Sequence, residues 1–172
     1  DGVFNRKIPV AKTKEVVEKI SRYRKSDLNL LLDFIIDNPY ESEEDIIETY
    51  RYLVDMPDEL RISLFNLVFF PGSPLYERAL HDGIIDPFDE QDFRPYLSKI
   101  KYQINYPTFL ILLFYFLQSF RLTRYIPRSL LHRLGSPSIT AFMQHFPKRF
   151  QRFLVKGPAR FEFIIRTVTQ WG

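Results

Sequence analysis

The chain has 172 residues, 45% of them hydrophobic, and a chain of this size can form one ordinary domain that buries about 70% of its unfolded surface. It contains no cysteine, which excludes a disulfide, a thiolate metal site and a cysteine nucleophile. The net charge of +3 is unevenly distributed: residues 1–100 carry 13 Lys and Arg against 20 Asp and Glu, whereas residues 101–172 carry 11 Lys and Arg and one acid, Glu162. This change predicts a boundary between two structural layers near residue 100.

The first 100 residues predict alternating helices and strands. After Pro9 and Thr13 we expect a helix whose apolar face consists of Val16, Val17, Ile20 and Tyr23. Residues 29–36, NLLLDFII, are almost continuously apolar, as in a strand buried on both faces. Asp37-Asn38-Pro39 ends this strand, and Ser42 with Asp45 indicates a capping box at the start of a helix over 43–54. That helix should bury Ile46, Ile47, Tyr50, Leu53 and Val54.

A second strand and helix follow in the same order. Residues 62–70 form the expected strand, a Pro-Gly turn follows, and a short helix over 75–80 ends at Gly83. Each connection between strands is long enough for a parallel crossover. The sequence therefore predicts an α/β fold with a parallel sheet.

Strand alternation assigns side chains to the two faces of the sheet. On the first strand, one face carries Asp33, Ile35 and Asp37, and the other carries Leu32, Phe34 and Ile36. On the second, we place Asn66 with Leu64, Val68 and Phe70, opposite Phe65, Leu67 and Phe69. The all-apolar faces should pack under helices, whereas Asp33, Asp37 and Asn66 should face a barrel lumen or a sheet crevice. The alternative is that Asp37 only ends the strand and that backbone amides hold Asp33.

The pattern changes after residue 85. Residues 86–106 are polar and irregular, and residues 107–172 predict a basic, aromatic-rich helical extension. Its nine apolar residues over 109–117 are far fewer than the roughly 20 that span a bilayer. This segment is therefore a buried core helix or, less often, an interfacial one. Gly135 and Pro137 precede a further segment over 138–155, and Gly157-Pro158 precedes the last one, over 160–171.

The C-terminal tail interleaves cations with aromatic rings, which permits two interpretations. One is a binding module that docks on RNA or on an anionic membrane surface. The other is a helical cap that closes the mouth of a barrel, with Arg and Lys on the solvated side. We favour the cap, because the rings recur at near-helical spacing, at Phe142, Phe146, Phe150 and Phe153.

The sequence gives little support for a metal site, a phosphate-binding loop or an acyl-transfer site. His81, His132 and His145 are not at metal-ligand spacing, so we expect no metal ligands in this chain. Pro71-Gly72-Ser73 resembles an anion-binding turn but lacks the glycines of a phosphate loop. No arrangement of Ser, His and Asp indicates acyl transfer.

The block from Asn5 to Ile85 resembles the C-terminal half of the radical S-adenosylmethionine (SAM) barrel. It is most similar to the branch whose members often carry an N-terminal cobalamin-binding domain. The matching pieces are NRKIPVAKT after the family's fourth strand, DFIIDNPYESEEDIIET at its fifth strand and helix, and FFPGSPLYERALHDGII at its sixth. The resemblance implies the C-terminal part of a partial (β/α)6 TIM-like barrel over residues 1–85, followed by the connector over 86–106 and the helical extension over 107–172.

The family's fifth-strand signature, G-x-I-x-G-x-x-E, corresponds here to Asp33-x-Ile35-x-Asp37-x-x-Glu41, so that both glycines are replaced by aspartate. The resemblance implies that Ile35 contacts the adenine of SAM and that Glu41 braces the loop after the strand. It also implies adenine contacts at Phe70 and Pro71. The carboxylate of Asp37 is expected to reach substrate or a SAM hydroxyl, and Asp33 and Asn66 are expected to line the substrate cavity.

The resemblance also implies a [4Fe–4S] cluster, which the family holds with three cysteines after its first strand, whereas this chain has no cysteine. Together with a start at Asp1, this predicts the distal portion of a cytoplasmic radical SAM enzyme that is inactive alone. The cluster ligands, and a cobalamin domain where one exists, would lie upstream. We expect a small-molecule or lipid-like substrate and no nucleic acid, and peripheral membrane contact is compatible with the basic tail.

Overall fold

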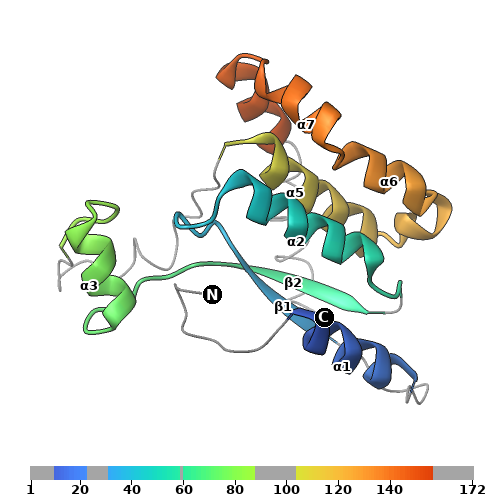
Figure 1. Cartoon of the computed structure of the whole chain (residues 1–172), viewed down its shortest axis with the longest axis horizontal. Coiled ribbons are helices and arrows are strands. Elements are labelled where there is room, and N and C mark those ends of the chain that lie inside the picture. The colour runs from blue at the N-terminus through green and yellow to red at the C-terminus, as the bar shows by residue number, and fades with distance from the viewer. Residues whose placement is uncertain (1–9, 23–30, 59, 88–103, 157–172) are drawn as a thin grey trace.

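The computed structural model describes residues 10–22, 31–58, 60–87 and 104–156, and it shows a mixed α/β chain, mostly helical, with a two-stranded parallel sheet (Figure 1). The elements in chain order are α1 (Val10–Arg22), β1 (Leu31–Ile36), α2 (Glu43–Asp55), β2 (Arg61–Asn66), α3 (Pro74–His81), α5 (Tyr106–Ser119), the 3-10 helix η1 (Leu122–Tyr125), α6 (Arg128–Leu134), α7 (Pro137–Gln144) and a helical segment over residues 148–156. Tyr23, most of the predicted connector and the segment predicted over 160–171 lie outside the described residues.

The predicted parallel sheet is confirmed. β1 and β2 pair in parallel with Leu32 opposite Ile62 and Phe34 opposite Leu64, and α2 connects the two strands. Ile62 and Leu64 belong to the hydrophobic core, and Leu32 and Phe34 pack against it. This side of the sheet therefore lies under α2 and α5, while α1 lies on the opposite side (Figure 1).

α2 forms as its sequence predicts. The Ser42 hydroxyl accepts a hydrogen bond from the Asp45 backbone N–H, and the Asp45 carboxylate accepts one from the Ser42 backbone N–H at 2.8 Å. Acidic residues in the first turn also stabilise this end of the helix, because they face its positive dipole. All five residues predicted to be buried on α2 are buried.

α5 is a buried core helix, one of the two alternatives for the apolar run over 109–117. It begins at Asn105, whose side chain accepts a hydrogen bond from the Thr108 backbone N–H at 2.9 Å, and Pro107 occupies its first turn. Its buried side chains include Leu110, Ile111 and Leu112, and it lies beside α2 (Figure 1). Among the described residues, no helix combines the length and the hydrophobicity that crossing a membrane requires.

Side-chain hydrogen bonds to backbone carbonyls hold α6 against α2. The buried Tyr50 hydroxyl donates to the carbonyl of Leu131 at 2.8 Å, and Arg51 donates to the carbonyl of Gly135 at 2.9 Å. A Cβ atom at Gly135 would lie 2.9 Å from the Tyr50 ring, so only glycine allows this approach. One core thus includes residues from β1 to the helical segment over 148–156.

Two predictions about the second strand are wrong. β2 ends at Asn66 rather than at residue 70, and Leu64, predicted to face away from the helices, is 1% exposed beneath them. Phe65, predicted to face the helices, is 46% exposed on the open side, and Leu67 lies beyond the strand. The physical reason is register: Ile62 and Leu64 pair with Leu32 and Phe34, so the apolar side of β1 determines the side that β2 buries.

The predictions for α1 and for the C-terminal helices are also only partly correct. On α1, Val17 is buried, whereas Val16 and Ile20 are exposed. The segment predicted over 138–155 is two helices, because Pro147 lies between α7 and the helical residues 148–156. η1 and α6 were not predicted.

Candidate functional site

The candidate site is the edge of the sheet at which both strands end. Because β1 and β2 are parallel and Ile36 pairs with Asn66, the loops that follow them start side by side. Ligands of open α/β sheets bind at the carboxyl ends of strands. Residues 37–42 and 67–73 form these loops, and they contain most of the predicted site residues.

Asp37 and Asn66 meet at this edge. The Asn66 amide Nδ2 donates a hydrogen bond to Asp37 Oδ2 at 3.3 Å. Asp37 has a φ of 62°, in the left-handed region that few residues other than glycine adopt. The Asn66 oxygen, Oδ1, is buried and has no hydrogen-bond donor among the described residues, which leaves a free acceptor beside the Asp37 carboxylate.

The route by which Asn66 reaches this position differs from the prediction. Asn66 has the same parity as the buried Ile62 and Leu64, so it does not belong to the open face of the sheet that carries Asp33 and Ile35. Asn66 does not pack in the hydrophobic core, because it is the last residue of β2. There its side chain can turn toward the loop that follows the neighbouring strand.

The loop after β1 is braced from within by Asn38. This side chain is 2% exposed; its Oδ1 accepts a hydrogen bond from the Tyr40 backbone N–H, and its backbone carbonyl accepts one from Glu41, each at 3.1 Å. The Asn38 side chain also hydrogen-bonds the Glu41 carboxylate. Burial raises the pKa of Glu41, and this hydrogen bond offsets part of that effect.

The open face of the sheet presents apolar side chains beside this edge. Ile35 is 45% exposed and pairs with Phe65, which is exposed to the same degree. Asp33 pairs with Ser63 on this face and is exposed. An apolar surface next to a few polar groups is typical of small-molecule sites.

Phe70 and Pro71 lie on the loop after β2. The Ser73 backbone N–H donates to the Phe70 carbonyl at 3.1 Å, and Gly72 has a φ of 80°, which together with Pro71 makes a type II turn. Ser73 then caps α3, because its hydroxyl accepts a hydrogen bond from the Tyr76 backbone N–H at 3.2 Å. The turn holds Phe70 and Pro71 exposed to solvent.

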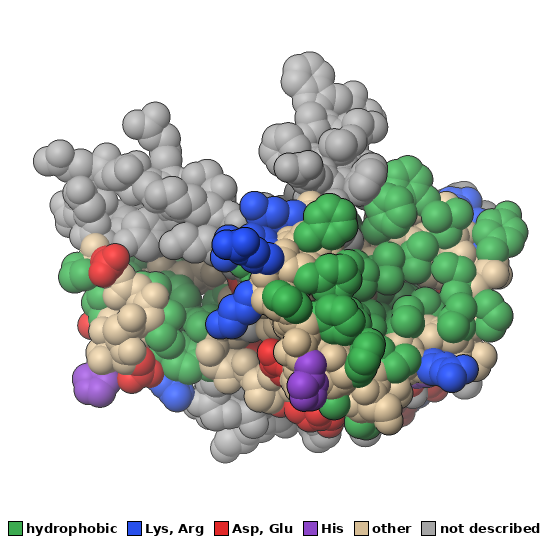
Figure 2. All heavy atoms as spheres, turned by 90° about the horizontal axis from the view of Figure 1, so that it is seen from above, with side chains coloured by type: hydrophobic (Ala, Val, Ile, Leu, Met, Phe, Trp, Pro, Cys, Tyr) green, Lys and Arg blue, Asp and Glu red, His purple; other side chains and the backbone are tan. Residues whose placement is uncertain are grey.

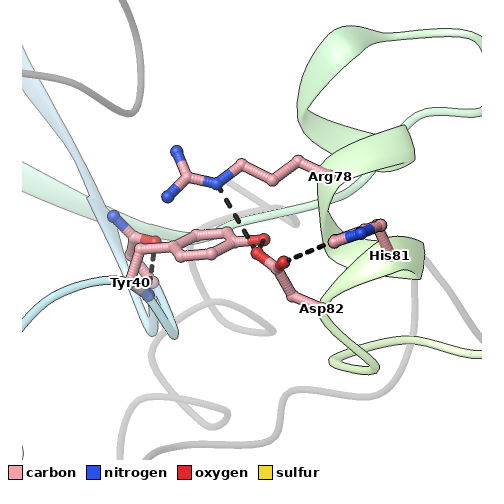
Figure 3. A network of polar contacts seen from close by, with 5 residues as sticks. Tyr40, Arg78, His81 and Asp82 are labelled. Carbon is pink, nitrogen blue, oxygen red and sulfur yellow. Dashed lines mark hydrogen bonds and ion pairs between the residues drawn. The ribbon is translucent and has the colours of Figure 1, made fainter.

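A polar network that the sequence analysis missed joins the loop after β1 to the C-terminal end of α3 (Figure 3). The Tyr40 hydroxyl donates to Asp82 Oδ2 at 3.2 Å, and the Arg78 guanidinium lies 4.6 Å from the centre of the Tyr40 ring. Asp82 also contacts His81 Nδ1 at 3.1 Å and Arg78 Nε at 3.5 Å. The signal was the spacing of Arg78, His81 and Asp82 at the end of α3, which places them near one another, but nothing in the sequence indicated Tyr40 as their partner.

This network shifts the pKa values of its acid and its phenol in opposite directions. The hydrogen bonds from His81 and Tyr40, with the charge of Arg78, hold the pKa of Asp82 below its ordinary value. Partial burial and the hydrogen bond to Asp82 raise the pKa of Tyr40. Near neutral pH the network therefore keeps an ionised carboxylate and a neutral hydroxyl, which fixes Tyr40 against α3.

The edge as a whole can bind a ligand that has an apolar ring and hydroxyl groups. Ile35 and Phe65 offer the apolar surface, and the Asp37 carboxylate offers hydrogen-bond acceptors. No group of three or more His, Asp or Glu is placed to hold a metal ion within the part of the chain that the structure describes. Comparison with protein-family models, with curated proteins and with solved structures finds no match to this chain.

Proposed function

We propose that this chain supplies the distal βα units of a radical SAM barrel and binds S-adenosylmethionine at the carboxyl edge of β1 and β2. The observation that carries the proposal is the backbone of Asp37. This residue stands where the family signature has its second glycine, and its φ of 62° lies in the region that glycine favours. A glycine would adopt this backbone conformation readily, which supports the alignment of Asp37 with the second glycine of the signature.

The last residue of the signature supports the same proposal. The resemblance implies that Glu41 braces the loop. In this chain Glu41 hydrogen-bonds the side chain of Asn38 through its carboxylate and the carbonyl of Asn38 through its backbone N–H. Ile35, the apolar residue of the signature, is exposed on the open face, where a ring can lie against it. In this proposal Ile35, Phe70 and Pro71 contact adenine, and Asp37 accepts hydrogen bonds from the ribose hydroxyls.

The two remaining polar residues, Asp33 and Asn66, are assigned to the substrate. Asp33 is exposed on the open face two residues before Ile35, and Asn66 lies at the strand end with its amide nitrogen on Asp37 and its oxygen buried. The chemistry of these groups suits a substrate that donates hydrogen bonds, such as a hydroxylated or amine-bearing small molecule.

The residues of this chain fit SAM but do not fit an iron–sulfur cluster. Such clusters are held by cysteine thiolates, and the sequence has no cysteine. In this proposal, the iron–sulfur cluster, and cobalamin where it is used, are held by residues outside this sequence. Enzymatic turnover is a proposal for the intact protein only.

Titration of the isotopically labelled chain with SAM, followed by the backbone amide signals in NMR, tests this proposal. We expect weak binding that shifts the amides of residues 35–41 and 66–72 and leaves those of α6 unchanged. Asp37→Ala should weaken binding, whereas Glu48→Gln, which alters an exposed carboxylate on α2, should not. Shifts centred on another part of the chain, or no shifts at saturating SAM, would contradict the proposal.

A further inference from the structure

The helices farthest from the sheet expose large hydrophobic side chains. On α7, Phe142 is 63% exposed, and on the helical segment over 148–156, Phe153 is 74% exposed. Tyr125, Leu130 and Phe150 are also exposed on η1, α6 and this segment. Figure 2, which views the chain from this side, shows hydrophobic side chains gathered over one half of the face, with Lys and Arg beside them. We refer to α6, α7 and residues 148–156 as the outer face.

The cations of the outer face lie on the same side of the helix as its exposed ring. Gln151 and Val155 are buried, which turns Arg149, Arg152, Phe153 and Lys156 outward. None of these three cations, nor Lys148, forms an ion pair with a carboxylate of the described residues. The positive charge of this surface is therefore available to a partner.

The rings of the outer face pack against one another. Phe142 and Phe146 meet edge to face with centroids 5.2 Å apart, and Phe146 and Phe150 lie 5.0 Å apart. Single-stranded RNA needs separate ring faces on which bases can stack. A continuous ring cluster instead suits hydrocarbon, as does the exposed Leu130 on α6, and the cations on the same surface suit lipid phosphates.

We propose that the outer face docks on an anionic phospholipid surface, with α7 and the helix over 148–156 lying in the plane of the membrane. Phe142 and Phe153 enter the boundary between headgroups and acyl chains, and Arg149, Arg152 and Lys156 contact phosphates. The charge of the chain matches this partner, because residues 101–172 carry 11 Lys and Arg and one acid. This inference does not depend on SAM binding, since the outer face and the carboxyl edge of the sheet share no residue.

Sedimentation with vesicles tests the inference on the whole chain. We expect it to sediment with vesicles of equimolar phosphatidylcholine and phosphatidylglycerol, to remain in solution with phosphatidylcholine alone, and to dissociate at high salt. Arg149→Glu with Arg152→Glu should weaken binding about tenfold or more, because each cation near an anionic surface contributes appreciably. Lys12→Glu with Lys19→Glu, the matched reversal on α1, should leave binding unchanged.

The absence of cysteine allows a second measurement that reports insertion directly. Phe153→Cys, labelled with an environment-sensitive fluorophore, should brighten and shift to the blue with anionic vesicles, whereas labelled Val16→Cys on α1 should not. Circular dichroism of each variant without lipid verifies that it is folded. Equal binding to neutral vesicles, a response at position 16 but not at 153, or binding to single-stranded RNA in the absence of vesicle binding would each overturn the inference.

Discussion

The layer formed by α2, α5 and α6 and the carboxyl edge of the sheet hold their polar groups differently, although each contains one buried polar atom without a partner among the described residues, Tyr52 Oη on α2 and Asn66 Oδ1 at the edge. In the layer, the hydroxyls of Tyr50 and Tyr106 each donate to a backbone carbonyl of α6, and the apolar side chains around them are buried. At the edge, Asp37 has a left-handed backbone and Asn66 keeps an unused buried oxygen. Strain and unsatisfied groups persist only where surrounding structure supports them, and they concentrate at functional sites. The layer therefore contributes most of the packed core, and the edge carries the left-handed backbone of Asp37.

The largest expected difference concerns the two faces of β2. Leu64→Ala should lower the free energy of unfolding by about 2–5 kcal/mol through lost burial and a residual cavity, because Leu64 is 1% exposed in the core. Phe65→Ala, one residue along the strand, should cost less than about 1 kcal/mol, because Phe65 faces solvent. Urea denaturation of both variants measures this difference. A larger loss for Phe65→Ala would show that the faces are assigned the wrong way round.

The next prediction tests whether the layer depends on satisfied polar groups. Tyr50→Phe removes the donor to the buried Leu131 carbonyl and should cost about 1–3 kcal/mol of unfolding free energy. Tyr125→Phe makes the same chemical change at an exposed residue and should change stability little. If the two substitutions had equal effects in thermal or urea denaturation, the buried hydrogen bond would contribute nothing to the stability of the layer.

A smaller effect is expected at the edge and depends on the backbone of Asp37. Both Asp37→Ala and Asp37→Gly remove the carboxylate, but only alanine retains a Cβ in the left-handed conformation. Asp37→Gly should therefore be more stable than Asp37→Ala by about 1 kcal/mol. Both variants should lose SAM binding in the NMR titration, which separates the contribution of the carboxylate from that of the backbone.

The smallest effect is a pH dependence that originates at Glu41. Burial raises its pKa above the ordinary value of 4.5, so the folded chain retains a proton that the unfolded chain has released. Stability contributed by this group is therefore complete below the ordinary pKa and decreases as pH rises through the raised one. The decrease should be less than about 1 kcal/mol, because Glu41 is only half-buried. Glu41→Gln should abolish it, as urea denaturation at several pH values between about 4 and 7 can determine.

Asp45 serves as the internal contrast in the same experiment. Hydrogen bonds from Ser42 lower its pKa, so its contribution to stability is present above its ordinary pKa and is lost as pH falls through the lowered one. Asp45→Asn should therefore reduce the acid-induced loss of stability. It should leave most of the change above pH 4.5 in place, because burial raises the pKa of Glu41 more than the charge of Asp45 does. If Asp45→Asn removed the change at higher pH, Glu41 would not be its source.

Where the sequence predicted structure correctly, the signal was local. The capping box of Ser42 and Asp45 and the spacing of apolar residues predicted α2 and each of its buried side chains, because a helix is determined by residues three and four apart. Pro107, a residue that suits the first turn of a helix, similarly lies in the first turn of α5. The parallel pairing of the two strands was also predicted, because each connection is long enough for a parallel crossover.

Where prediction failed, the deciding contact was distant in the chain. Ser63 and Asn66 have opposite parity on β2, and the sequence alone does not show which of them marks the solvent side; pairing with β1 decides. The Tyr40 hydroxyl meets Asp82 across 42 residues, which no periodic pattern encodes. α2 and α5 lie on opposite sides of the charge change near residue 100 and share one core, which the charge pattern does not indicate.

The hydrogen bond from Tyr50 to Leu131 spans 81 residues, and the one from Gln144 to Glu43 spans 101. Translation proceeds from the N-terminus, so α2 emerges from the ribosome long before the segments that cover it. Until then its apolar side remains open to chaperones and to aggregation. Contacts of such long sequence separation also slow folding, because the loop must close before they form. Folding of this chain is therefore completed after most of it has been synthesised, when α6, α7 and the helical segment over 148–156 are available.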